Sequence, residues 1–353
     1  MKVWSVAILT VFSLYITSFS PDIIIEPISI TTHDGIEISG AIELPAKGNL
    51  LPSVILAWGN GPHTRDQEIS GTPMFKLISD ALVNNGIAVM RIDKRGFGSS
   101  SVKFDNSEET YTTLDLKKDI ELGLQLLKDH SRTDKDKVGI IGHSEGAIIA
   151  TMLNAEDKLA WSILMAPPAV SGKEIFLEQR RLNRVRLGMD ETISDAVGMA
   201  FAQYVDFIKS DFTNDEVHYE KGKAFLLAHG MTEDDDLFGK ELVDQVLDGF
   251  RNQWYKYFFN QDMNHLLSSI KSPTLAIYGA KDNQVTTRQN MNPCLLALKK
   301  SGIPYQVTVL SECDHFFLTF EGNYVEKHVF GQMEIASDLI PIMMGFLESN
   351  DVL

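Results

Sequence analysis

A serine that could act as a nucleophile stands at the centre of Gly142-His143-Ser144-Glu145-Gly146, a Gly-x-Ser-x-Gly pattern. The pattern alone is short enough to occur by chance. Here a strand-like run, Lys137–Ile141, leads into it, and a helix-like run, Gly146–Asn154, leads out. A serine on such a sharp strand-to-helix turn stands clear of the sheet and can attack a carbonyl carbon. An ordinary glycine-rich turn is the alternative.

A serine hydroxyl needs a base, and on a sheet of this kind an acid and then a histidine follow the serine in the chain. Asp282 comes just after the strand-like run Pro273–Tyr278, and His315 comes just after Gln306–Leu310. Because parallel strands end at one edge of a sheet, both side chains are expected to meet the serine there. We therefore predict a catalytic triad with His315 as base and Asp282 as its orienting acid. The alternatives are ordinary loop roles for both residues, or His328 as the base.

The oxyanion of an acyl-transfer transition state needs two preplaced N–H donors, each contributing roughly 10²–10³ in rate. One predicted donor is the backbone amide of Glu145, which follows the serine at a helix N-terminus that favours negative charge. The other is expected in the loop after the third strand, Trp58-Gly-Asn-Gly-Pro-His-Thr-Arg-Asp66. We predict the amide of Asn60, with that of Gly61 as the second choice. A simple Gly-Pro turn is the alternative.

The elements that must position these residues alternate between strands and helices. Two Ile-rich runs flank an Asp-Gly turn and predict an antiparallel hairpin, Ile23–Thr32 with Ile36–Leu44. The later alternation predicts an α/β fold, with a mostly parallel sheet and helices on both faces. The other expected strands are Ser53–Trp58, Ile87–Ile92, Lys137–Ile141, Ala160–Ala166, Pro273–Tyr278 and Gln306–Leu310. Helices are expected after an N-cap at Thr72, over Thr112–His130 and Gly146–Asn154, and between the last two strands.

One long stretch, residues 171–267, has helical patterns and no convincing strand. It lies between two strands and predicts a helical cap over the carboxyl ends of the sheet. The core is therefore expected in two parts, 21–170 and 268–353, on either side of this cap. Residues 1–20 have one charge, Lys2, before an apolar run and are typical of a secretory signal. They predict export to the periplasm or the outside, with an uncleaved membrane anchor as the alternative.

Composition limits the class of protein. The 353 residues are 44% hydrophobic and 23% charged, as in ordinary globular proteins, which excludes a disordered chain, a collagen, a coiled coil and a multi-span membrane protein. The formal charge of −16 disfavours a nucleic-acid partner, because phosphate backbones attract basic faces. Two cysteines, Cys294 and Cys313, are too few for a disulfide scaffold, and whether they pair is open.

No cofactor and no metal are predicted. Gly96-Phe-Gly98 follows a strand but lacks the third glycine of a dinucleotide-binding loop. The sequence has no His-Glu-x-x-His or comparable spacing of metal ligands. The acidic run Glu233–Asp236 in the cap favours a solvated face. Its alternative role is attraction of a substrate amino group, which would favour a peptidase.

Together these pieces resemble the α/β-hydrolase superfamily, and more closely a group of exported bacterial esterases and serine aminopeptidase-like hydrolases. The resemblance covers nearly the whole chain after the signal and implies the fold and triad expected above. Four motifs carry it: Gly59-Asn-Gly-Pro-His-Thr-Arg-Asp66, Asp93-Lys-Arg-Gly-Phe-Gly-Ser-Ser100, the Gly142–Gly146 turn and Gly279-Ala-Lys-Asp-Asn-Gln-Val285. The chain departs from the group at Trp58, where a histidine is common, at Ala147, where a second glycine is frequent, and at Cys313-Asp314.

The expected function is hydrolysis of small to medium carboxylic esters through an acyl-enzyme intermediate. Trp58 and His143 flank the predicted catalytic groups in sequence and are expected to contact the substrate. A peptidase that removes residues from the amino ends of short peptides with the same triad is one alternative, and a non-catalytic binding module is another. The expected partner is a small ester or short peptide, with no membrane contact apart from an uncleaved N-terminal anchor. The acyl group, the leaving group and the oligomeric state are open.

Overall fold

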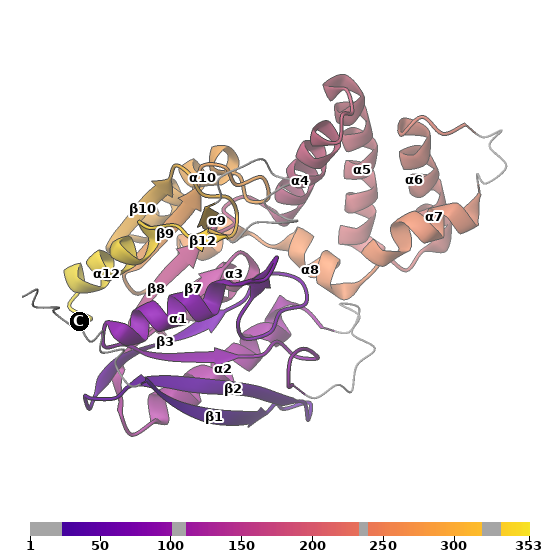
Figure 1. The fold of residues 1–353 in the computed structure, drawn as a ribbon. Helices are drawn as coiled ribbons and strands as arrows, with labels where there is room; N and C mark the ends of the chain where they lie inside the picture. The colour runs from indigo at the N-terminus through magenta and orange to yellow at the C-terminus, as the bar shows by residue number, and fades with distance from the viewer. Residues whose placement is uncertain (1–22, 101–110, 233–238, 320–332) are drawn as a thin grey trace, which may run out of the picture.

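The computed structural model describes residues 23–100, 111–232, 239–319 and 333–353. Within these residues the centre is an eight-stranded sheet in the order β1-β2-β6-β3-β7-β8-β9-β10 (Figure 1). Strand β2 runs antiparallel to both its neighbours, and the other pairs are parallel. The strands are β1 (Ile23–Thr31), β2 (Glu37–Pro45), β3 (Leu51–Ala57), β6 (Ala88–Ile92), β7 (Thr133–His143), β8 (Trp161–Met165), β9 (Thr274–Gly279) and β10 (Tyr305–Leu310).

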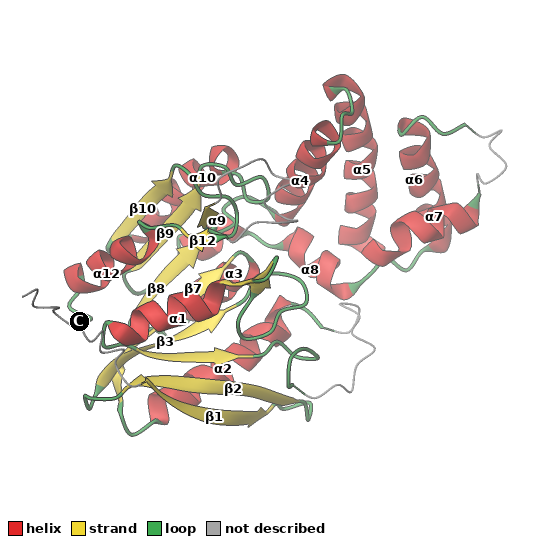
Figure 2. Ribbon diagram, viewed as in Figure 1, coloured by secondary structure: helices red, strands yellow, loops and turns green. Residues whose placement is uncertain are grey.

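Helices cover both faces of this sheet (Figure 2). Helices α1 and α12 pack together on one face, and α2 and α3 pack together on the other. Every residue of β6, β8 and β9 is buried, as expected for strands covered on both faces. The helices that flank the sheet are α1 (Met74–Asn84), α2 (Thr113–Asp129), α3 (Glu145–Ala155), α10 (Thr287–Ser301) and α12 (Leu339–Ser349).

The predicted elements are confirmed in their order, with small differences at their ends. The N-terminal hairpin pairs Ile23 with Pro45 and Thr31 with Glu37. Helix α2 begins after Thr112, whose side chain caps it in a reciprocal capping box with Asp115. Helix α1 begins at Met74 rather than after an N-cap at Thr72, because the Thr72–Pro73 segment is extended as β5 and pairs with β4 (Glu68–Ile69).

The chain between β8 and β9 forms a helical insertion that projects from the carboxyl ends of the strands (Figure 1). Its helices are α4 (Gly172–Arg186), α5 (Glu191–Asp211), α6 (Asp215–Ala228), α7 (Lys240–Leu247), η1 (Asp248–Phe250), α8 (Gln253–Asn260) and α9 (Met263–Leu267). They surround an aromatic-rich hydrophobic cluster that also includes Ile148 and Met152 of α3. The expected helical cap is therefore present and is seated on α3.

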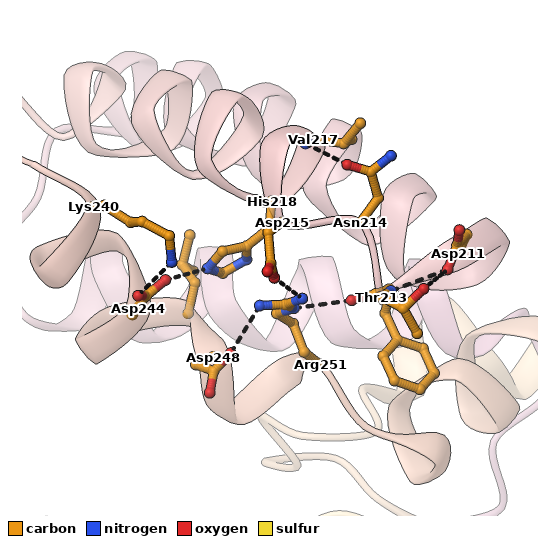
Figure 3. A network of polar contacts seen from close by, with 12 residues as sticks. Asp211, Thr213, Asn214, Asp215, Val217, His218, Lys240, Asp244, Asp248 and Arg251 are labelled. Atoms are coloured by element: carbon orange, nitrogen blue, oxygen red, sulfur yellow. Dashed lines mark hydrogen bonds and ion pairs between the residues drawn. The ribbon is translucent and has the colours of Figure 1, made fainter.

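Polar contacts join the cap helices where α5 ends and α6 begins (Figure 3). The Arg251 guanidinium donates to Asp215 Oδ1 at 2.7 Å and to the Phe212 carbonyl at 2.9 Å. His218, fully buried, bonds through Nε2 to Asp244 Oδ1 at 3.0 Å. These contacts hold the end of α5, the start of α6 and α7 in one unit, while the aromatic cluster supplies most of the apolar burial that stabilises the helices.

Several predictions made from sequence lie outside the described residues: the signal segment 1–20, the acidic run Glu233–Asp236 and the alternative base His328. Export therefore stays a prediction. In the part of the chain that the structure describes, no helix combines the length and apolarity needed to span a bilayer. Cys294 and Cys313 are both buried and are not joined by a disulfide. Burial raises the pKa of the Cys294 thiol to about 12.

Candidate active site

Ser144 lies on the sharp turn between β7 and α3, with φ 55° and ψ −112°. Its amide donates to the Met165 carbonyl of the adjacent strand at 2.9 Å. A Cβ at Gly142 would lie 2.1 Å from the Gly146 carbonyl oxygen, and a Cβ at Gly146 would lie 2.0 Å from that of Ala57. Both glycines are therefore required for the strand and helix to approach this closely, and Ser144 is held in a strained backbone conformation.

Asp282 and His315 meet at the same edge of the sheet, in the loops that follow β9 and β10. His315 Nδ1 donates to Asp282 Oδ2 at 2.8 Å, and both side chains are buried. The other carboxylate oxygen accepts the amides of Gln284 at 2.7 Å and Val285 at 2.9 Å. These bonds hold the carboxylate, which in turn places the proton on Nδ1 and leaves Nε2 as the basic nitrogen.

His143 links the serine turn to the histidine loop. It is 1% exposed, and its Nε2 donates to the His315 carbonyl oxygen at 2.8 Å while Nδ1 accepts from Gln67 Nε2 at 2.7 Å. Burial lowers the pKa of His143 well below its ordinary value, and the neighbouring His315 lowers it further, so the ring is neutral. His143 therefore keeps the backbone of His315 beside the turn that carries Ser144.

The loop after β3 is held by two buried polar side chains. The Gly59 amide donates to Gln67 Oε1 at 3.0 Å, and the Gly59 and Gly61 carbonyls accept from Lys94 Nζ at 3.3 and 3.1 Å. Since the C=O and N–H of one peptide point in opposite directions, the amide of Asn60 faces away from Lys94. The Gly61 amide donates to Asn60 Oδ1 at 2.7 Å, so of the two predicted donors the amide of Asn60 is the one left for a ligand.

The side chain of Glu145, directly after the serine, joins three parts of the molecule. Its carboxylate accepts from Lys94 Nζ at 3.2 Å, from Thr113 Oγ1 at 2.8 Å and from the Trp254 indole of α8 at 2.7 Å. Lys94 is fully buried, and a buried ion pair is tolerated because these further hydrogen bonds satisfy both groups. Sequence reasoning assigned only the amide of Glu145, and no spacing signal connects residues so far apart in the chain.

A cavity of about 440 Å³ lies between the serine turn and the cap. Ser144, Asn60, Glu145 and Val285 are among the residues that line it from the sheet side. Helices α4 and α8 line it from the cap side, with apolar side chains and with arginines of α4. The predicted nucleophile and the two preferred oxyanion residues, Glu145 and Asn60, therefore line one cavity, whereas Gly61 does not.

Trp58 and His143 are not among the residues that line this cavity, and neither are Asp282 and His315, so substrate contact by Trp58 and His143 stays a prediction. Trp58 is 1% exposed, and its indole donates to the Ile92 carbonyl at 2.7 Å. His143 is used on both ring nitrogens by Gln67 and His315. Both side chains are buried and hydrogen-bonded within the protein.

His63 is a titratable group of the Asn60 loop. Its Nε2 donates to the Asn60 carbonyl oxygen at 2.9 Å, and burial, reinforced by the charge of Lys94, lowers its pKa from 6.5 to about 4. Between these two values the unfolded chain binds a proton that the folded chain does not. The stability contributed by neutral His63 is therefore present at neutral pH and is lost as the pH falls from 6.5 toward 4.

We expect His63→Gln to flatten this part of the pH dependence, since an amide can still donate to the Asn60 carbonyl but does not titrate. The measurement is the free energy of unfolding in denaturant at several pH values between 7.5 and 4, for the wild type and the variant. The values at pH 7.5 serve as the internal control. Parallel curves for the two proteins would contradict the assignment.

Among the described residues, no group of three or more His, Cys, Asp or Glu side chains is arranged to hold a metal ion. The Gly96-Phe-Gly98 turn is used structurally. A Cβ at Gly98 would lie 2.5 Å from the Asp93 carboxyl carbon, and Asp93 Oδ2 accepts from the Ser99 amide and from Arg65. The close approach of Asp93 accounts for the glycine there.

Comparison with known proteins adds to these observations. The family model described as alpha/beta hydrolase fold matches residues 61–321. The chain is 30% identical over 290 residues to Esterase EstD of Thermotoga maritima, an alignment that covers 81% of this chain and 59% of that protein. The chain thus spans less than two thirds of the length of this curated relative.

Solved structures agree on the fold. The DcsB complex with its substrate analogue matches with a TM-score of 0.56 and 16% identity, over 92% of this chain and 99% of that one. The Pyrococcus furiosus esterase Pf2001 matches with a TM-score of 0.52 and 18% identity, over 92% and 90%. Given the sheet order, the strained serine turn and the family match over most of its length, the chain belongs to the alpha/beta hydrolase fold family.

Proposed function

We propose that the protein is a serine hydrolase that cleaves carboxylic esters with Ser144, His315 and Asp282. The observation that carries the proposal is the buried Asp282–His315 hydrogen bond, at the sheet edge where Ser144 stands on its strained turn. The curated relative EstD, named an esterase, supports the choice of ester over other acyl substrates. Small-molecule esters are the proposed substrates, because the cavity of about 440 Å³ falls within the range of small-ligand sites.

In the proposed reaction, Ser144 Oγ attacks the ester carbonyl carbon and its proton passes to His315 Nε2. Asp282 holds the Nδ1 proton and stabilises the imidazolium that forms. The oxyanion accepts hydrogen bonds from the amides of Glu145 and Asn60. His315 then gives the proton to the leaving alcohol, and a water molecule, deprotonated by the same base, hydrolyses the acyl-enzyme to release the acid.

Two features of the backbone support the roles of these amides. Glu145 is the first residue of α3, so its N–H is one of those that have no acceptor within the helix. Asn60 has its preceding carbonyl turned toward Lys94, which aims its own N–H the other way. Removing one such donor in an acyl-transfer enzyme lowers the rate roughly 10²–10³-fold.

The two alternatives receive less support. The peptidase alternative uses the same triad, and the acidic run Glu233–Asp236 that would favour it lies outside the described residues. The binding-module alternative gives no reason for the strain at Ser144 or for a buried carboxylate bonded to His315. Ester hydrolysis is therefore the proposal, and the relative named an esterase is what favours it over peptide cleavage.

The experiment that tests the proposal is labelling with a fluorophosphonate probe, which reports an activated serine without requiring the natural substrate. We expect the wild type to be labelled and Ser144→Ala to be unlabelled at the same folded content. Ser311→Ala removes an exposed serine of the His315 loop and should be labelled like the wild type. A folded wild type that resists the probe, or a labelled Ser144→Ala, would overturn the proposal. Ester and peptide panels on the unlabelled wild type then separate esterase from peptidase.

A further inference from the structure

The residues that line the cavity differ from the protein as a whole in the sign of their charge. The sequence has a formal charge of −16, yet the charged residues that line the cavity are two arginines of α4, Arg180 and Arg186, and one acid, Glu145. The Glu145 carboxylate is already shared by Lys94, Thr113 and Trp254. The Glu145 carboxylate is therefore not a partner of Arg180.

Helical spacing turns one stripe of α4 toward the cavity. Phe176, Gln179, Arg180 and Asn183 line it, at i, i+3, i+4 and i+7 along the helix. Residues at this spacing share one face of a helix. The cationic and apolar side chains of this stripe thus face the space above Ser144, although Arg180 and Asn183 stay solvent-exposed at its mouth.

Arg180 is held by aromatic rings. Its guanidinium carbon lies 5.0 Å from the centre of the Phe176 ring and 5.3 Å from that of Phe250. Within the described residues no carboxylate lies at ion-pair distance from it. Its neighbour Arg181, in contrast, pairs with Glu178 at 3.2 Å. Stacking fixes the plane of a guanidinium and leaves the N–H groups on its edge for an anion.

We infer that the cavity takes an ester that also bears a carboxylate, which Arg180 binds while the ester carbonyl lies at Ser144. This inference rests on the proposed function and names its substrate class. A guanidinium fork matches the two oxygens of a carboxylate, and the apolar side chains Ile148, Ile175 and Val285 can pack against the carbon chain between the two groups. The carboxylate stands either on the acyl part or on the alcohol part of the ester.

Paired substrates test the inference and distinguish these two sources of the carboxylate. On the acyl side, the mono-4-nitrophenyl ester of glutaric acid is compared with 4-nitrophenyl pentanoate, which has the same chain length and no charge. On the alcohol side, 3-acetoxybenzoate is compared with 3-acetoxybenzamide. We expect the ratio of kcat/KM, anionic over neutral, to exceed about ten in one pair, and to fall roughly tenfold in Arg180→Gln, as when a charged hydrogen-bond partner is lost.

Two further variants separate a specific contact from general electrostatics. Arg181→Gln removes the same charge from the same helix, does not line the cavity, and should leave the ratio unchanged within about twofold, since exposed charges act weakly through water. Arg180→Lys keeps the charge without the planar fork and should retain part of the ratio. A wild-type ratio near one in both pairs, or an equal fall in Arg180→Gln and Arg181→Gln, would overturn the inference.

Binding to Ser144→Ala gives a readout that needs no turnover. By calorimetry, this variant should bind the anionic member of the preferred pair about tenfold more tightly than the neutral one, and Ser144→Ala/Arg180→Gln should not. If the wild type is labelled by the fluorophosphonate but neither rates nor binding favour the anion, the inference fails and the proposed function stands. If Ser144→Ala hydrolyses esters as fast as the wild type, the proposed function fails, and the binding measurement still decides whether Arg180 recognises carboxylates.

Discussion

His315→Ala is expected to lower kcat for 4-nitrophenyl butyrate by about 10⁵–10⁶-fold, as large as the loss from removing the nucleophile itself in enzymes of this kind. Without the imidazole, nothing accepts the Ser144 proton during attack or returns a proton to the leaving alcohol. The backbone contact of this loop should survive, because the bond from His143 goes to the main-chain carbonyl of residue 315. Asp282 keeps its bonds from the Gln284 and Val285 amides.

The measurement is steady-state hydrolysis together with thermal unfolding of the same preparations. His130→Gln changes a histidine at the far edge of the sheet, where it bonds Glu26, and should leave kcat within about twofold of the wild type. A His315→Ala protein that is folded and retains more than a hundredth of the wild-type kcat would show that another group is the base. His328 would then be the next histidine to replace.

Asp282→Asn is expected to lower kcat by about 10⁴-fold while the fold is kept. The amide can still accept the Gln284 and Val285 N–H groups through its oxygen, so its NH₂ group would be directed to His315 Nδ1. An amide donating to Nδ1 moves the ring proton to Nε2. That nitrogen then cannot accept the proton of Ser144, so geometry is preserved and the base is lost.

The matched control is Asp314→Asn, one residue before the histidine. The Asp314 carboxylate accepts the Phe316 amide at 2.9 Å and belongs to the turn of the loop, not to the imidazole. We expect it to lower kcat less than tenfold. If Asp314→Asn were the more damaging of the two substitutions, Asp282 would not be the acid of the triad. kcat and KM for one ester, measured for both variants, decide the question.

Most of the fold could be predicted from local sequence patterns. Apolar runs of strand length and an Asp-Gly turn predicted the hairpin and the parallel strands, because burial on both faces leaves a clear composition. The helical run predicted over Thr112–His130 differs from α2 by one residue at each end. Helix α12 was not predicted, because Leu339–Ser349 is apolar on nearly all sides and shows little amphipathic period.

Chain order and strand ends were enough to predict that Asp282 and His315 meet, since a parallel sheet delivers its loops to one edge. The hydrogen bonds that hold the surrounding loops in place were not predictable. Gln67 bonds His143 across 76 positions, and Lys94 reaches Glu145 across 51. Such pairs depend on how three loops pack, and neither residue type nor spacing encodes that packing. For the same reason His143 was expected at the substrate, whereas the fold uses both of its ring nitrogens internally.

The hydrogen bond from the Trp254 indole to the Glu145 carboxylate couples the position of the cap to the order of the proposed oxyanion donors. A motion of α8 away from α3 must either break this bond or displace a carboxylate whose own residue supplies a proposed oxyanion amide. An interaction that stabilises the cap on α3 therefore also stabilises the ordered oxyanion site, and the coupling free energy is the same in both directions. Substitutions in α8 should accordingly alter turnover along with affinity, so that specificity and rate in this protein evolve together rather than as separate modules.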